Sequence, residues 1–159
     1  MSRITRIDID DSAIAPATPE MEQERRVAIF DLIEDNSFVV PGRDGLPVPE
    51  GPYVLQLCIR EGRLVFDLAT EDHRPVAEFH LSLGPFRQVV KDYFQICQSY
   101  FDAVKKLPTA QIEAIDMGRR GLHNEGSEVL RERLADKVDV DHNTARRLFT
   151  LICVLHIRA

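Results

Sequence analysis

The spacing of apolar residues changes once along the chain, and this change constrains the fold more than any other feature. Between residues 53 and 83, apolar side chains recur at every second position, which is the period of a β-strand with one buried face. From residue 85 onward they recur at the 3.6-residue period of an α-helix. Strands grouped before helices predict an α+β domain.

The first of these regions predicts three strands joined by short connections. They centre on residues 53–60, 64–69 and 77–83, with a tight turn at Glu61-Gly62 between the first two. Short connections between alternating strands favour an antiparallel meander with one face on the core. Ile7 and Ile9 also alternate with polar residues, so the sheet is expected to contain about four strands.

The second region predicts a layer of helices. One helix is expected from Pro85 to about Lys106, and a second starts at Thr109. A last helix is expected over residues 142–156, and it is apolar on nearly every side from Leu148 onward. Such a helix must be buried in the core or in a subunit interface, and it is one reason to expect a homodimer.

Before the strands, a loop over residues 11–17 and a further helix are expected. Thr18 is a predicted N-cap with Pro19 at the first helical position, and Val27, Phe30 and Ile33 form a predicted buried stripe. Residues 41–52 hold four prolines and three glycines and predict an irregular loop. We therefore expect one α+β domain over residues 1–159. Residues 1–83 are expected to contribute a helix and the antiparallel sheet. Residues 84–159 are expected to form the helical layer, with four to five helices in the whole domain.

Composition excludes several classes of protein. The net charge of −6 argues against indiscriminate binding to nucleic acid or to anionic membranes. The three cysteines are far apart and have no partner at zinc-site spacing, so we expect buried free thiols and no metal or cofactor. The N-terminus lacks the apolar segment of a signal peptide, and no apolar run could span a bilayer, which predicts a cytoplasmic protein.

The stretch from Ala114 to Ser127 concentrates polar chemistry between two helical patterns. It holds three glycines together with charged, imidazole, amide and hydroxyl side chains. In one continuous helix each glycine would cost about 1 kcal/mol relative to alanine, which suggests close backbone packing or a local break. The candidate ligand-binding residues of this stretch are Asp116, Arg119, Arg120, His123, Asn124 and Ser127.

The two backbone geometries place these residues differently. In a continuous helix, Asp116, Arg119 and His123 lie on the buried arc, with Arg120 and Ser127 at its edge. With a break at Gly118–Gly121, the amides around the two arginines could form an anion-binding nest at a new helix N-terminus. Both geometries put arginines where a carboxylate or phosphate could be held.

Three interpretations of this stretch remain open from the sequence. The first is an internal ion-pair network, with Arg119 bound to Asp116 and His123 bound to a backbone carbonyl. The second is a site for a small anion or for an acidic segment of a partner protein. The third is a catalytic site in which His123 is a general base, the arginines stabilise negative charge, and Ser127 is a nucleophile by proximity alone.

Residues 134–148 resemble a DNA-binding helix-turn-helix, with Arg146 and Arg147 in the would-be recognition helix. Asp139 stands where the turn glycine is usual, and together with Asp141 it would face phosphates. The helix also becomes too apolar after Leu148. Binding to nucleic acid is therefore not expected.

Three segments together resemble a known family. They are Phe86-Arg87 with Lys91-Asp92-Tyr93-Phe94, then Ile112 to Ser127, then Thr144-Ala145-Arg146-Arg147-Leu148-Phe149-Thr150-Leu151-Ile152-Cys153. This pattern is similar to an uncharacterised protein family of alphaproteobacteria with no assigned function. The resemblance spans essentially the whole chain and implies a bacterial cytoplasmic protein, without an activity or site residues.

The sequence as a whole favours a non-enzymatic binding or regulatory protein with a polar Arg/His site in its helical layer. The first alternative is a small enzyme that acts on an anionic substrate, with His123 as base and Arg119 and Arg120 as the anion clamp. The second alternative is a DNA-binding regulator that uses residues 134–148.

Overall fold

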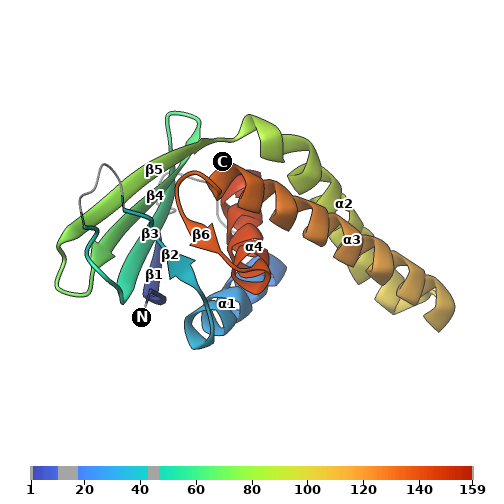
Figure 1. Cartoon of the computed structure of the whole chain (residues 1–159). Coiled ribbons are helices and arrows are strands. Elements are labelled where there is room, and N and C mark those ends of the chain that lie inside the picture. Colours follow the sequence, from blue (N-terminus) through green and yellow to red (C-terminus); the bar gives the residue numbers. More distant parts are fainter. Residues whose placement is uncertain (1, 11–17, 43–46, 159) are drawn as a thin grey trace.

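The computed structural model describes residues 2–10, 18–42 and 47–158, and it describes residues 156–158 by their backbone alone. The loop expected at residues 11–17 and part of the loop at 41–52, residues 43–46, lie outside the described residues. The rest of the chain forms a sheet on one side and helices on the other (Figure 1). This arrangement confirms the α+β class that the change of period predicted.

The meander is formed by the three strands that the sequence predicted. They are β3 (Tyr53–Arg60), β4 (Arg63–Thr70) and β5 (Pro75–Ser82), each antiparallel to the next. Glu61 and Gly62 both have positive φ angles, 53° and 73°, which is the geometry of a type I′ hairpin turn. The predicted turn at these two residues is confirmed.

The fourth strand departs from the expected antiparallel sheet. β1 (Ile4–Asp10) lies at the edge of the sheet and pairs with β3 in parallel, with Ile7 opposite Leu55. The helix α1 (Pro19–Glu34) stands between these two strands in the chain, and such a crossover connection returns the chain in the same direction. Alternation of apolar residues predicts a strand but carries no information about its direction.

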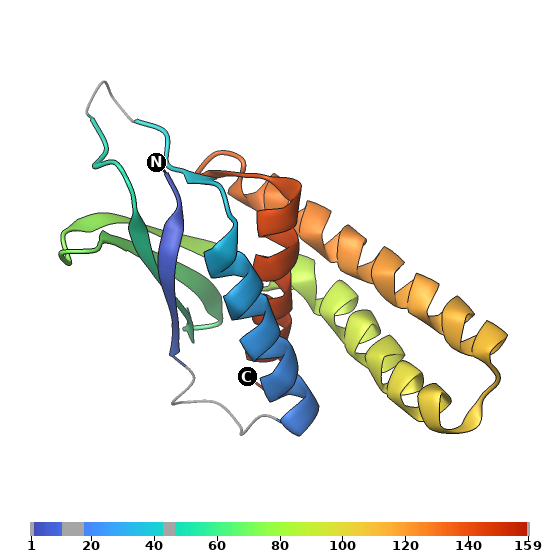
Figure 2. The same ribbon diagram turned by 90° about the horizontal axis from the view of Figure 1, so that it is seen from below.

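The helical layer contains α1 and three later helices. These are α2 (Arg87–Lys106, preceded by a 3₁₀ turn at Gly84–Phe86), α3 (Thr109–Leu134) and α4 (His142–Arg158). A second small sheet joins β2 (Phe38–Val39) to β6 (Asp139–Val140). α2 and α3 form a long hairpin whose far end projects from the body (Figures 1 and 2).

α1 begins as predicted but buries a narrower stripe. The Thr18 side chain accepts a hydrogen bond from the Met21 amide at 3.2 Å, which confirms the N-cap. The predicted stripe is wrong at Val27 and Phe30, whose side chains are 48% and 66% exposed. Ala28 and Leu32 are the buried residues of this helix, because its inner face is turned toward α4.

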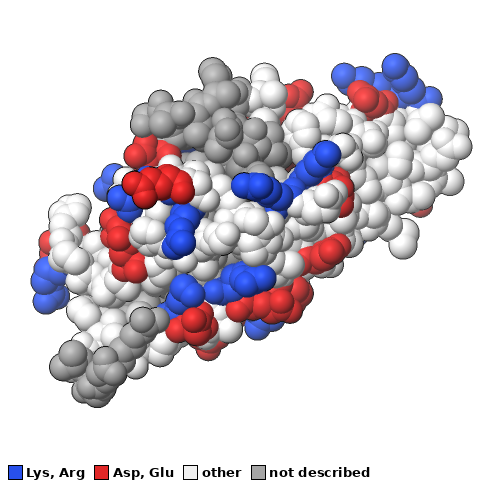
Figure 3. All heavy atoms as spheres, turned by 90° about the horizontal axis from the view of Figure 1, so that it is seen from above, with Lys and Arg blue, Asp and Glu red and all other residues white. Residues whose placement is uncertain are grey.

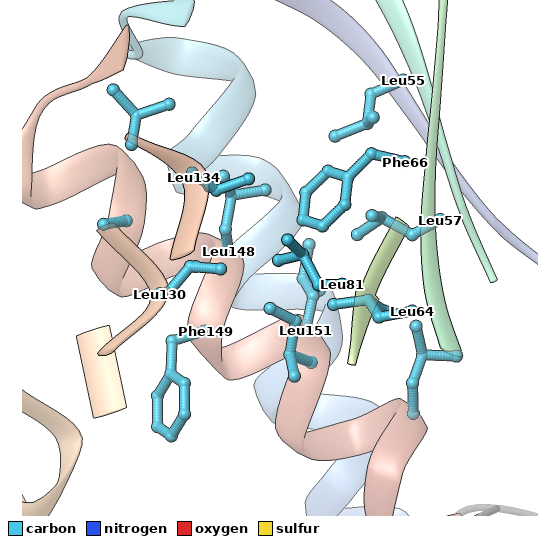
Figure 4. Close-up of a cluster of buried hydrophobic side chains, with 14 of the residues drawn as sticks. Leu55, Leu57, Leu64, Phe66, Leu81, Leu130, Leu134, Leu148, Phe149 and Leu151 are labelled. Carbon is cyan, nitrogen blue, oxygen red and sulfur yellow. The ribbon is translucent and has the colours of Figure 1, made fainter. Parts of the chain in front are cut away.

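α4 lies at the centre of the helical layer and contacts α1, α2 and α3. Leucines and a phenylalanine from the sheet meet side chains of α3 and α4 in one continuous core (Figure 4): Leu55, Leu57, Leu64, Phe66, Leu81, Leu130, Leu134, Leu148 and Leu151. The apolar character of α4 is thus satisfied within one chain. It does not by itself require a second copy.

The surface carries both signs of charge. On the face opposite to that of Figure 2, lysines and arginines are interspersed with acidic residues over the body of the molecule (Figure 3). Among the described residues, none of the helices has the length and apolar character needed to span a membrane.

Candidate functional site

A cavity of about 460 Å³ opens between α1, α3 and α4. Four arginines, two from α3 and two from α4, reach it, and we call it the arginine cavity. Its full lining is Gln23, Glu24, Val27, Ala28, Asp31, Tyr93, Arg119, Arg120, His123, Asn143, Arg146, Arg147 and Thr150. Its volume lies at the lower end of the range of small-molecule sites.

The polar stretch of the sequence lies on one unbroken helix. α3 runs from Thr109 to Leu134, so the nest expected from a break at Gly118–Gly121 is not formed. A β-carbon added at Gly118 would lie 2.8 Å from Cδ1 of Ile96, and one at Gly126 would lie 2.1 Å from Cζ of Phe149. Close packing against α2 and α4 therefore explains two of the three glycines.

Arg119 is held in place on α3 by two neighbours. Its Nη2 and Nε donate to Oδ1 of Asp116 at 2.7 and 3.1 Å, and its guanidinium carbon lies 4.6 Å from the centre of the Tyr100 ring. Arg120 forms an ion pair with the same carboxylate, with 2.9 Å between its Nη2 and Oδ2 of Asp116, but its side chain is 71% exposed. The hydrogen bond from Arg119, followed by the charges of both arginines, lowers the pKa of Asp116. Asp116 thus positions the arginines and does not line the cavity.

Arg146 and Arg147 add two guanidiniums from α4. Nη1 of Arg147 donates to the backbone carbonyl of Asp35 at 2.8 Å. The guanidinium of Arg146 makes no hydrogen bond or ion pair with any residue that the structure describes. It is the least constrained cation of the arginine cavity.

The same geometry argues against the helix-turn-helix interpretation. The would-be recognition helix is α4, the central helix of the layer, and Leu148, Phe149 and Leu151 on it are fully buried. A helix that packs against three others and is almost entirely buried from Leu148 onward has little surface to place in a major groove. Arg146 and Arg147 line the arginine cavity instead.

His123 is a partly buried residue of the site that packs between aromatic rings. Its ring stands edge-on between Tyr93 and Phe149, with ring centres 5.2 and 5.3 Å away. Nε2 lies 2.8 Å from the Thr150 hydroxyl, which itself donates to the carbonyl of Arg146 at 3.3 Å. The other ring nitrogen, Nδ1, is buried and has no hydrogen-bond partner among the described residues.

The charge state of His123 follows from this environment. Burial, followed by the nearby charges of Arg146 and Arg119, lowers the pKa of His123 to about 4. The imidazole is therefore neutral at pH 7. A base with such a low pKa and a solvent-inaccessible Nδ1 accepts protons poorly, so the geometry does not favour the catalytic interpretation of His123.

Two further candidates of the sequence lie away from the cavity. Ser127 is fully buried, and its hydroxyl donates to the His123 carbonyl one turn earlier at 2.7 Å. It is a packing residue without access to a ligand. Asn124 is exposed and is not among the lining residues.

The side of the cavity formed by α1 was not predicted from the sequence. Glu24, Ala28 and Asp31 recur at helical spacing and bring two carboxylates to the cavity on either side of a buried alanine. Burial raises the pKa of Glu24, while the charge of Arg119 lowers it. The helical spacing of Glu24, Ala28 and Asp31 could have indicated this inner face of α1. The larger apolar residues Val27 and Phe30 instead favoured the stripe that the sequence predicted.

The titratable side chains of the site can be compared with the ligand sets of known metal centres. The residues described include no group of three or more His, Cys, Asp or Glu side chains that could hold a metal ion. Cys58, Cys97 and Cys153 are free thiols. The predicted burial is confirmed for Cys97 and Cys153 and is wrong for Cys58, which is only half-buried in β3. What the site does offer is a set of hydrogen-bond donors with fixed positive charge.

Comparison with known proteins gives a consistent result over the whole chain. Residues 1–158 match the model of a family described as "Uncharacterised protein family (UPF0262)". A UPF0262 protein of Roseobacter denitrificans is 72% identical over 98% of each chain, and one of Paracoccus denitrificans is 71% identical over 97% of this chain and 95% of its own. A UPF0262 protein of Dinoroseobacter shibae is 68% identical over the full length of both. No solved structure matches the chain.

Proposed function

The chain belongs to the UPF0262 family, and we propose that it is a non-enzymatic binding protein that holds a small anion in the arginine cavity. Four arginines from two helices line one concavity, together with the amide side chain of Asn143. Guanidinium forks match the geometry of phosphate and carboxylate groups and remain charged at any physiological pH. A concave site of this size suits a small molecule better than a segment of a partner protein.

Arg146 supports the proposal most directly, because its guanidinium is unpaired among the residues that the structure describes. Its guanidinium lines the cavity with no hydrogen bond or ion pair to the described residues, whereas Arg119 and Arg147 are held by protein groups. A structural arginine is normally paired, because pairing offsets part of the cost of removing its charge from water. An exposed and unpaired guanidinium beside three others is available for an anion.

The proposed role of each residue in anion binding follows from the contacts that its side chain makes. Arg146 and the solvent-exposed fork of Arg120 contact the anion. Arg119, fixed by Asp116 and Tyr100, adds a charge in a constant position. His123 stays neutral and holds Thr150 and the backbone of α4 in place. We also place this function in the cytoplasm, where free thiols such as Cys97 remain reduced.

Thermal melting with and without anions tests this proposal. Inorganic phosphate, ethyl phosphate and propionate are titrated against the wild type, Arg146→Ala and the control Arg133→Ala, an exposed arginine of α3 outside the cavity. A ligand at 100 times its Kd stabilises the native state by about 2.7 kcal/mol. In a chain of this size that amounts to several degrees in Tm.

We expect at least one anion to raise the Tm of the wild type and of Arg133→Ala, and Arg146→Ala to lose that response. Arg146→Ala should melt at the wild-type temperature in buffer alone, because its guanidinium has no partner to lose. A wild type that responds to none of the anions, or an Arg146→Ala variant that responds fully, would contradict the proposal.

A further inference from the structure

The two sides of the arginine cavity carry opposite charges. All four arginines come from α3 and α4, whereas both carboxylates, Glu24 and Asp31, come from α1. These carboxylates are separated by two helical turns on one face, so they line the same wall. The cavity is therefore polarised from one wall to the other, and a simple anion would satisfy only one of them.

Neither carboxylate is paired with the arginines it faces. Among the described residues, Glu24 and Asp31 have no side-chain hydrogen bond and no ion pair within 4.0 Å. Charge attraction alone would favour direct Arg–carboxylate pairs across the cavity. The unpaired arrangement leaves a gap bounded by cations on one side and by anions on the other.

Glu24 lies in the less favourable environment of the two. It is half-buried, it also borders an apolar pocket lined by Met21, Phe94 and Phe101, and burial raises its pKa. A partly desolvated carboxylate without a hydrogen-bond donor costs free energy in the empty protein. A donor supplied by the ligand would remove that cost on binding.

Building on the proposed function, we propose that the ligand is a small zwitterion that carries a phosphate or carboxylate group and a primary amine. The anionic group contacts Arg120 and Arg146, and the ammonium donates to Glu24 across the cavity, with Asp31 adding negative charge on the same wall. The proposal assigns Glu24 as the residue that selects amines over simple anions. Nothing in the proposed anion site requires that selection.

The experiment compares ligand pairs that differ only in the amine. Phosphoethanolamine is compared with ethyl phosphate, and β-alanine with propionate, by calorimetric titration of the wild type, Glu24→Gln and Glu125→Gln. Glutamine keeps the size of Glu24 and removes its charge. Glu125 is an exposed glutamate of α3 outside the cavity, so Glu125→Gln controls for the loss of one negative charge.

In the wild type, we expect the amine-bearing member of at least one pair to bind about tenfold more tightly, the effect of one hydrogen bond to a charged group. Glu24→Gln should abolish this preference and bind the simple anion at least as tightly as the wild type does, since a repelling charge is gone. Glu125→Gln should keep the preference. A Tm in buffer alone that is no lower than that of the wild type would establish that each variant is folded, and Glu24→Gln should melt slightly higher because a partly desolvated charge is gone.

The outcomes separate this inference from the proposed function. If the simple anions bind and the amine gives no advantage, or if Glu24→Gln keeps the preference, the zwitterion inference is overturned and the anion site stands. If none of the four compounds binds the wild type, both proposals are overturned together.

Discussion

The ring of Phe149 on α4 rests directly on the α-carbon of Gly126 on α3. A β-carbon at position 126 would lie 2.1 Å from Cζ and 2.4 Å from Cε1 of that ring, far inside van der Waals contact. The same ring packs edge-on against His123 and Tyr93. The absence of one side chain thus sets how closely the two helices that supply the arginines approach each other.

Gly126→Ala should therefore destabilise the protein, although alanine is the better helix former. The added methyl group forces Phe149 or the α3 backbone to move, and overpacking of this kind costs at least about 2 kcal/mol. Chemical denaturation measures the effect as a lower free energy of unfolding.

Gly121→Ala is the matched control on the same helix. Apart from its chain neighbours and the nearby backbone of its own helix, no described heavy atom lies within 4 Å of the β-carbon position at Gly121, and the residue is exposed. Here the helix propensity of alanine should prevail and stabilise the protein by about 1 kcal/mol. Equal effects at the two positions would contradict the packing argument.

His123 should make the fold sensitive to mild acid. Its pKa is about 4 in the folded protein and near 6.5 when unfolded, so the unfolded chain binds more protons between these values. The stabilisation is complete above pH 6.5 and is lost as the pH falls toward 4, with about 2 kcal/mol lost between pH 7.5 and 5. Urea denaturation at several pH values measures this change.

His123→Gln isolates that contribution. The raised pKa of Glu24 acts in the opposite direction, because a carboxyl protonated more readily in the fold gains stability as the pH falls. The informative quantity is therefore the difference between wild type and His123→Gln at each pH. A difference that stays constant from pH 7.5 to 5 would show that His123 does not titrate as described.

Thiol reactivity should distinguish Cys58 from the other two cysteines. Burial raises the pKa of Cys97 to about 11 and raises that of Cys153, whereas Cys58 is only half-buried at the sheet surface. At pH 8 we expect Ellman's reagent to label one thiol per native chain and all three in denaturant. Cys58→Ser should remove the native signal, and rapid labelling of that variant would disprove the assignment.

Thr144→Val should weaken the contact between α4 and the segment that follows α1. The Thr144 hydroxyl is fully buried and accepts a hydrogen bond from the Ser37 amide at 3.0 Å. Valine keeps the shape but leaves that amide without an acceptor, at a cost of about 1–3 kcal/mol in the free energy of unfolding. Thr109→Val, at an exposed position that begins α3, should change stability by less than about 0.5 kcal/mol.

The local elements of this fold could be predicted because each has a local cause. Alternation located β3, β4 and β5, the Glu61-Gly62 pair between two alternating runs located a turn, and Thr18 with Pro19 located the start of α1. The direction of β1 could not be predicted, because direction depends on where the chain returns after α1. The exposure of Val27 and Phe30 was missed for a related reason: periodicity shows that a helix has an apolar face, while packing selects which part of that face is covered.

The candidate site divides in the same way. The sequence by itself determined that a continuous helix would carry Arg119 and His123 on one arc with Arg120 at its edge, since those positions follow from the helical repeat. The structure decided that the helix is continuous through Gly118 and Gly121. Only the tertiary structure brought Arg146 and Arg147 of α4 and Glu24 of α1 to the same cavity, because these residues lie on separate helices. Gly126 and Phe149 set the contact between two of those helices, and such long-range contacts arise only when the whole core is packed.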